Sequence, residues 1–123
     1  MIQNYVFERF EDEVIRRILT VDLKDNPDIS CQLLLQYKNA EIVQRHFFEQ
    51  GYYTEFSVLD EGLRLANRGN SEVGNTLAEI PNLRHGIGFL LFIRDGLISS
   101  FEGYTFGEKW PESFKKYTLV NAA

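Results

Sequence analysis

The feature that most constrains the fold of this chain is a pair of β-prone segments separated by Asp95-Gly96. Residues 86–93 are apolar at nearly every position, and residues 97–106 are rich in aromatic and β-branched side chains. Asp-Gly between two such segments is a strong signal for a tight β-hairpin turn. A strand that is apolar on both faces lies within a sheet and is covered on at least one side. We therefore predict an antiparallel hairpin in the middle of a sheet, with at least one face covered by helices.

A second hairpin is indicated by the alternation of side chains on either side of Gly51. Residues 42–48 and 52–58 both have a period of two and are separated by Glu49-Gln50-Gly51. Two β-prone segments joined by a short glycine-containing turn are typical of an antiparallel hairpin. We expect residues 60–76 to be loop with a short strand, and residues 77–80 to add another strand.

Two helices are predicted before these hairpins and one after them. Apolar residues recur at helical spacing from Phe7 to Val21, which predicts a helix over residues 9–20. Asn26-Pro27-Asp28 has the pattern of an N-cap, a first-position proline and a first-turn acid, and this second helix should stop near Lys38-Asn39. Trp110-Pro111-Glu112 predicts a short C-terminal helix. The expected fold class is α+β: an antiparallel sheet of two β-hairpins, about four to five strands, with two N-terminal helices packed on it and a short C-terminal helix.

Length and composition exclude several classes of protein. The 123 residues predict a single domain, 1–123, and the net charge of −5, from 13 basic and 18 acidic residues, argues against binding nucleic acid or an anionic membrane. The single cysteine, Cys31, excludes an intrachain disulfide and a multi-thiolate zinc site. The first residues lack a signal-peptide pattern, and the longest apolar segment, residues 89–93, is too short to span a bilayer. We therefore expect a cytoplasmic protein.

No set of residues has the spacing of an established catalytic or metal site. Cys31 with His46 or His85 could form a nucleophile and base, but an inert apolar cysteine and ordinary histidines are the commoner interpretation. Glu102 shares a strand face with Tyr104, and on a covered face its carboxyl could act as a general acid or base. Its alternative is a structural carboxylate paired with an arginine. We predict no catalytic residue, no metal and no cofactor.

One hairpin has more aromatic residues than its buried face can use. Tyr53 alternates in phase with Glu55 and Ser57, so it should be exposed among acids. Exposed tyrosine beside carboxylates is typical of a surface that binds a basic protein. The alternative is a solvated face with one tolerated tyrosine. The predicted partner-binding residues are Glu49, Tyr53, Glu55, Asp60, Glu61 and Glu72.

The segment from Gly86 to Pro111, GIGFLLFIRDGLISSFEGYTFGEKWP, resembles the closing hairpin of a widespread group of small bacterial proteins. Their pattern is GxGFxLFxxDGxxxxLEGYTYGxxWP, from which this chain departs with Phe101 for leucine and Phe106 for tyrosine. Residues 49–56 are similar to their Gly-aromatic-aromatic-Thr hairpin, and the resemblance covers about residues 29–111. These motifs specify a fold and carry no catalytic residue.

The resemblance implies a function by binding. Members of the group are similar in size and acidity to immunity proteins of bacterial toxin systems, including contact-dependent growth inhibition. We therefore expect an immunity-type protein that neutralises a cognate basic toxin, an RNase or DNase, by occluding its active site or substrate-binding surface. The alternatives are a small ligand-binding module and a hydrolase- or isomerase-like enzyme that uses Glu102. The oligomeric state stays open.

Overall fold

The computed structural model describes residues 2–122 of the chain, with side chains from Val6 onward. Its helical elements are α1 (Ile2–Arg17), the π-helical turn η1 (Ile18–Asp22), α2 (Pro27–Lys38) and the 3-10 turn η2 (Glu61–Leu63). Its strands are β1 (Ala40–Phe48), β2 (Gly51–Val58), β3 (Ser71–Val73), β4 (Thr76–Glu79), β5 (Ile87–Arg94), β6 (Leu97–Thr105) and β7 (Thr118–Asn121).

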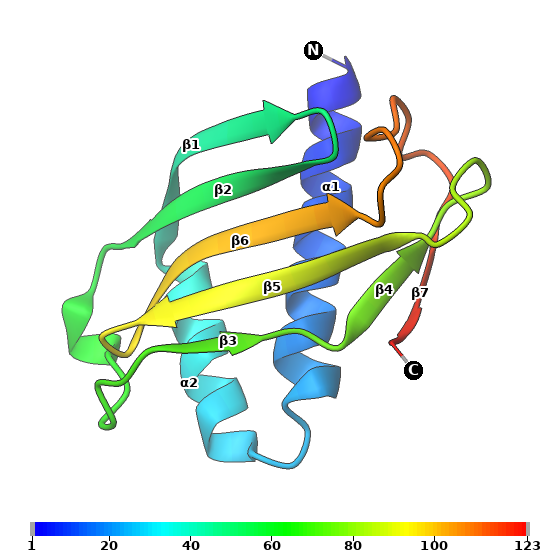
Figure 1. Cartoon of the computed structure of the whole chain (residues 1–123). Helices are drawn as coiled ribbons and strands as arrows, with labels where there is room; N and C mark the ends of the chain where they lie inside the picture. Colours follow the sequence, from blue (N-terminus) through cyan, green and yellow to red (C-terminus); the bar gives the residue numbers. More distant parts are fainter. Residues whose placement is uncertain (1, 123) are drawn as a thin grey trace.

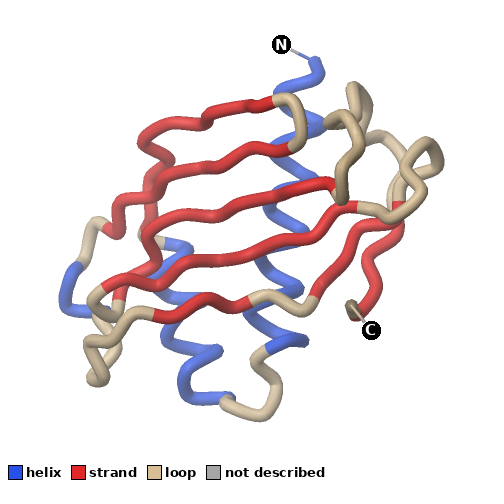
Figure 2. The backbone as a smooth tube through the Cα atoms, in the orientation of Figure 1, coloured by secondary structure: helices blue, strands red, loops and turns tan. Residues whose placement is uncertain are grey.

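All seven strands form one antiparallel sheet in the order β1-β2-β6-β5-β4-β7, with β3 paired to β5 beside β4. Both helices lie on one face of this sheet, and no helix covers the other face within the described chain (Figure 1). The tube view shows the same two layers, with the strands crossing in front of the helices (Figure 2). The core lies between these layers, where Phe10, Ile18, Phe89 and Phe101 are almost wholly buried.

The structure confirms the α+β class and both hairpins but corrects the number of strands. The sheet has seven strands rather than four or five. The short strand expected within residues 60–76 corresponds to β3, and the prediction for residues 77–80 anticipated β4. The strand without a prediction is β7, whose four residues are too few to show a clear alternation in the sequence. It forms because β4 offers a free edge to this distant segment.

The predicted C-terminal helix is wrong. The segment between β6 and β7 is irregular, and β7 then follows it. The Trp110 N–H donates to the Glu49 carbonyl at 2.7 Å, and the Tyr117 hydroxyl donates to Glu13 at 2.6 Å, so the segment is tied at both ends. Phe114 is buried between these points. These contacts hold the segment against the core in an irregular conformation. A helix this short has little intrinsic stability, so it does not form in competition with them.

The helix boundaries agree better at α2 than at α1. The capping signal at Asn26-Pro27 is confirmed, because α2 runs from Pro27 to Lys38. The first helix covers Ile2–Arg17 rather than 9–20, and its last predicted turn widens into the π-helical turn η1. No helix in residues 2–122 combines the length and the apolar character needed to cross a membrane.

A buried carboxylate fixes α1 against the first hairpin. Glu11 is only 3% exposed and receives Arg45 at 2.6 Å, the Tyr52 hydroxyl at 2.9 Å and the Thr54 hydroxyl at 2.5 Å. Burial raises the pKa of Tyr52 well above its usual value, and the charge of Glu11 adds to this. Burial alone would lower the pKa of Arg45, but its hydrogen bond and charge interaction with Glu11 outweigh burial and raise it. The network therefore consists of a carboxylate, a guanidinium and two neutral hydroxyls.

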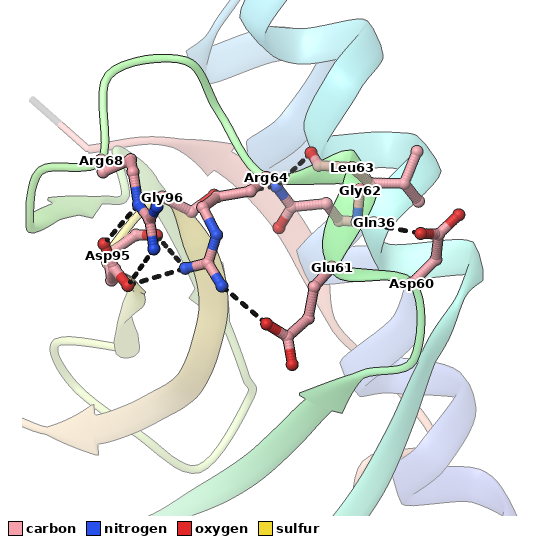
Figure 3. A network of polar contacts seen from close by, with 9 residues as sticks. All are labelled: Gln36, Asp60, Glu61, Gly62, Leu63, Arg64, Arg68, Asp95 and Gly96. Carbon is pink, nitrogen blue, oxygen red and sulfur yellow. Dashed lines mark hydrogen bonds and ion pairs between the residues drawn. The ribbon is translucent and has the colours of Figure 1, made fainter.

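A buried amide fixes α2 against the second hairpin (Figure 3). Gln36 is fully buried, and its Nε2 donates to the Leu63 carbonyl at 3.0 Å and the Gly96 carbonyl at 2.9 Å. Its Oε1 accepts from the backbone N–H of Ile98 at 2.8 Å. One side chain thus joins α2, η2 and the β5–β6 turn, and satisfies backbone groups that would otherwise be buried without partners.

The β5–β6 turn is also held by two arginines from the segment that connects β2 to β3 (Figure 3). Asp95 has a φ of 52°, a left-handed conformation in which Asp and Asn are enriched among non-glycine residues. Its carboxylate accepts from Arg64 at 2.8 Å and from Arg68 at 3.0 Å. The hydrogen bond from Arg68 is the largest influence on the pKa of Asp95, which lies below its ordinary value of 3.8.

Strand β1 forms one edge of the sheet and is unusually apolar for an exposed strand. Its pairing with β2 is interrupted between Ile42 and Gln44, so Val43 forms a bulge. Val43 is 61% exposed, and Ile42, Phe47 and Phe48 are each about half exposed. This edge therefore presents apolar side chains together with an irregular backbone.

Replacing Glu11 with leucine should destabilise the protein by about 3–5 kcal/mol, since Arg45 and two hydroxyls would lose their buried partner. Glu8 is the matched control: it lies 3.8 Å from the same arginine, but its side chain is 56% exposed. Glu8→Leu should cost less than about 1 kcal/mol. Chemical denaturation measures both variants, and equal losses would contradict the assignment of Glu11 as the organising group.

Replacing Asp95 with asparagine should make stability less sensitive to acid. A carboxyl whose folded pKa lies below its unfolded value stabilises the fold above pH 3.8, and this contribution disappears as the pH falls through the folded pKa. Asparagine keeps the left-handed turn but has no charge to lose. The difference in denaturation midpoint between wild type and Asp95→Asn should therefore shrink between pH 6 and pH 3. A difference independent of pH would refute this role of Asp95.

Candidate functional site

The candidate functional site is the sheet face that the helices leave uncovered, here called the open face (Figure 1). Residues paired directly across neighbouring strands point to the same side of a sheet, so the strand register arranges the open face into transverse rows. The first row contains Gln44, Glu55, Ser100, Phe92 and Glu72. The second contains His46, Tyr53, Glu102 and Leu90. The third contains Phe48, Gly51, Tyr104, Gly88 and Leu77.

Three of these rings form a cluster on the β1–β2 hairpin. The imidazole of His46 stacks on Tyr53 with 5.5 Å between ring centroids and 8° between ring planes. Phe48 lies 5.8 Å from the same tyrosine. Because its neighbours cover part of the ring, Tyr53 is half-buried rather than fully exposed as predicted. The cluster holds the tyrosine in place without hiding it.

A second aromatic pair lies across β5 and β6. Gly88 is paired with Tyr104, and the tyrosine ring lies over the glycine so closely that a Cβ at Gly88 would come within 2.6 Å of it. Phe106 packs edge-on against Tyr104 at 5.5 Å. Tyr104 remains 36% exposed and Phe106 48% exposed. The missing side chain at Gly88 thus lets an aromatic ring lie flat on the sheet.

The charges within the three rows are all carboxylates, apart from the titratable His46. Glu102 is the direct neighbour of Tyr53 across the strands, and Glu55 follows Tyr53 by two residues on β2. Glu55 accepts from the Gln44 amide at 2.9 Å, so only one of its oxygens is engaged by this contact. Glu72 is three strands away from Glu55 along the first row, or about 14 Å at the usual strand spacing. The three rows are therefore acidic and aromatic, and Arg94 adds one positive charge beside the first row, over the Phe92 ring.

The structure places three of the predicted partner-binding residues on the open face. Tyr53 and Glu55 lie next to each other in phase on β2, as the alternation predicted. Glu72 lies on the short strand β3, opposite Phe92. Glu49 lies in the β1–β2 turn at one end of the face, where it is exposed.

The other two predicted residues do not join this group. Asp60 and Glu61 lie beyond the far end of β2 from Glu49, separated from it by the strand's eight residues, or about 27 Å. Asp60 accepts from the Gly62 N–H at 2.9 Å, and Glu61 accepts from Arg64 at 2.8 Å, so both are engaged within the η2 loop (Figure 3). The six predicted residues therefore do not form one continuous patch.

Sequence reasoning missed most of the apolar part of the open face. The alternation within each strand already assigned a face to every residue, but the register that brings the strands together is not local information. The additional residues are His46, Phe48, Leu90, Phe92, Tyr104 and Phe106.

The chemical candidates Glu102 and Cys31 are both exposed. Glu102 is exposed because its face is uncovered, so the condition under which it could act as a shielded acid or base is not met. Cys31 is exposed on α2, whereas His46 projects from the open face. Among the described residues, no three His, Cys, Asp or Glu side chains are grouped to hold a metal ion. Three cavities, of about 400, 440 and 330 Å³, are lined by residues outside the three rows.

Comparison of the chain with protein-family models, with curated proteins and with solved structures gives no match. The carboxylates beside aromatic rings on the open face can bind a surface that offers cations and flat apolar groups.

Replacing Gly88 with alanine should destabilise the protein by about 1–3 kcal/mol, because the new methyl group must displace the Tyr104 ring. In a Tyr104→Ala background the same substitution should cost much less. Thermal or chemical denaturation of the two single variants and the double variant gives the coupling energy. A coupling near zero would show that the ring does not lie over Gly88 in solution.

Proposed function

We propose that this protein binds a basic protein through its open face and acts as an immunity-type inhibitor of a cognate toxin. The observation that carries the proposal is the composition of the three rows, which hold Glu55, Glu72 and Glu102 among aromatic rings and no lysine or arginine. Arg94 lies beside the first row with its guanidinium carbon 4.9 Å from the centre of the Phe92 ring, so a cation already packs on one ring of this face. An uncovered sheet face with this composition is poorly suited to an anionic partner. It is well suited to a cationic one.

Each part of the face has a role in such binding. The carboxylates of Glu55 and Glu102 flank Tyr53 on neighbouring strands, so an arginine side chain can pair with a carboxylate while its planar group lies on the ring. Tyrosine at the centre of a patch is a common anchor of protein interfaces. The stacking of His46 on Tyr53 reduces the side-chain freedom that binding would otherwise remove.

The net charge of the chain also favours a basic partner. An excess of five negative charges attracts a basic partner over distances longer than direct contact and speeds association at low salt. Nuclease active sites bind phosphate and are therefore cationic, so an acidic partner that covers such a site blocks the substrate by its bulk and by its charge. The proposed mechanism is occlusion, with no covalent step.

The direct test is capture of the product of the adjacent open reading frame, followed by charge reversal on the open face. The double variant Glu55→Lys/Glu102→Lys should weaken the complex at least tenfold, equivalent to about 1.4 kcal/mol. The matched control Asp28→Lys/Glu112→Lys has the same net charge but alters exposed acids at the start of α2 and in the segment before β7. Isothermal titration calorimetry measures both.

In cells, wild type and the control variant should restore growth when the neighbouring gene is expressed, and the open-face variant should not. If both double variants weaken the complex equally, net charge alone explains the loss of affinity, and the assignment of the open face as the binding surface is contradicted. Absence of any complex, together with tolerance of the neighbouring gene when this one is lost, would sink the immunity function itself.

A further inference from the structure

A cavity of about 440 Å³ lies on the helical side of the sheet, between α2, the short strand β3 and the loop that follows η2. Figure 1 shows β3 running across α2 at the lower part of the sheet. Leu33 of α2 and Ile93 of β5 form its inner wall and belong to the protein core. Ile29 lies on its lining but remains 41% exposed. The apolar lining residues are Leu23, Ile29, Leu33, Leu65, Ala66, Val73 and Ile93.

The polar groups of this cavity are all uncharged. They come from Gln32 on α2 and from Asn67, Asn70 and Ser71 of the loop leading into β3. The Asn70 side-chain oxygen accepts from the Asp95 N–H at 2.9 Å, and Asn70 is exposed, so its amide nitrogen is open to solvent and available to a ligand. Gln32 donates weakly to the Arg64 carbonyl at 3.3 Å, and its amide oxygen is without a partner within residues 6–122.

This lining selects the chemical class of a ligand. Burying an ion beside apolar walls costs several kcal/mol unless an opposite charge meets it, and none of the lining residues supplies one. Uncharged amides can instead satisfy a carbonyl, hydroxyl or N–H group of a neutral molecule. An apolar cavity of about 150 Å³ holds benzene, so the larger volume here admits more than one ring.

The cavity is open to solvent, because Ile29, Asn67 and Ser71 at its rim are exposed, while Leu33 and Ile93 at its floor are buried. It lies within the size range of small-molecule sites, which combine apolar walls with a few polar groups. We propose that it binds an uncharged, largely apolar small molecule with one or two hydrogen-bonding groups. This site is separate from the open face, which lies on the other side of the sheet, and does not depend on the function proposed for it.

The test uses N-phenyl-1-naphthylamine, a neutral fluorophore with a naphthyl and a phenyl group whose emission rises in an apolar site. Titration of the full chain should give saturable binding of one equivalent. Ile29→Lys should weaken this binding at least tenfold by placing a charge at the lining. Leu35→Lys is the matched control, because Leu35 is on the same helix and 44% exposed but does not line the cavity. It should leave the affinity within about twofold.

A second variant, Ala66→Trp, fills the cavity from an exposed loop position and should also abolish binding. Circular dichroism confirms that each variant is folded before titration. The anionic analogue 8-anilinonaphthalene-1-sulfonate should bind at least tenfold more weakly than the neutral probe. The proposal is overturned if the neutral probe does not saturate, if Ile29→Lys and Leu35→Lys behave alike, or if the anionic probe binds equally well. Glu55→Lys/Glu102→Lys should retain probe binding, so the two proposals fail independently.

Discussion

The carboxylate of Glu11 is the interaction on which the arrangement of the first hairpin depends. It accepts from an arginine of β1 and two hydroxyls of β2; the carboxylate and both hydroxyl-bearing side chains are buried, and the Arg45 side chain is 19% exposed. Rotating or sliding α1 would leave a buried charge without its partners, so only one placement of the helix satisfies them. That placement fixes Tyr52 and Thr54 inward. The alternate residues Tyr53 and Glu55 must then face outward, and the candidate binding face is a direct result.

The parts of the fold that could be predicted from the sequence are those specified by neighbouring residues. Asp95-Gly96 defines one turn and Asn26-Pro27 defines one helix start, and the structure contains both. The short strand β7 depends on pairing with β4, about 40 residues earlier in the chain, which no local pattern records. The predicted C-terminal helix was wrong for the same reason: its capping signal was local, whereas the contacts that hold the segment are made with α1 and the first turn.

The candidate site was predictable to a similar extent. The alternation on β2 was enough to place Tyr53 with Glu55, but the neighbour of Tyr53 across the strands, Glu102, required the register of β6. Asp60 was predicted to join Tyr53 because the two residues are close in the sequence. In the structure Asp60 lies beyond the end of β2 rather than beside Tyr53. Glu11 did leave a signal, since it falls on the stripe of Phe7, Val14 and Ile18 at steps of four, three and four residues. An acid on such a stripe indicates a buried partner.

The bulge at Val43 has a consequence for the protein at high concentration. An exposed edge strand is a template onto which another chain can add by backbone hydrogen bonding, and apolar side chains strengthen that addition. In β1 the irregular step between Ile42 and Gln44 divides a nine-residue strand into two shorter regular segments. An incoming strand that matches one segment is out of phase with the other. The same edge that exposes Phe47 and Phe48 is thus protected against uncontrolled polymerisation by a single unpaired residue.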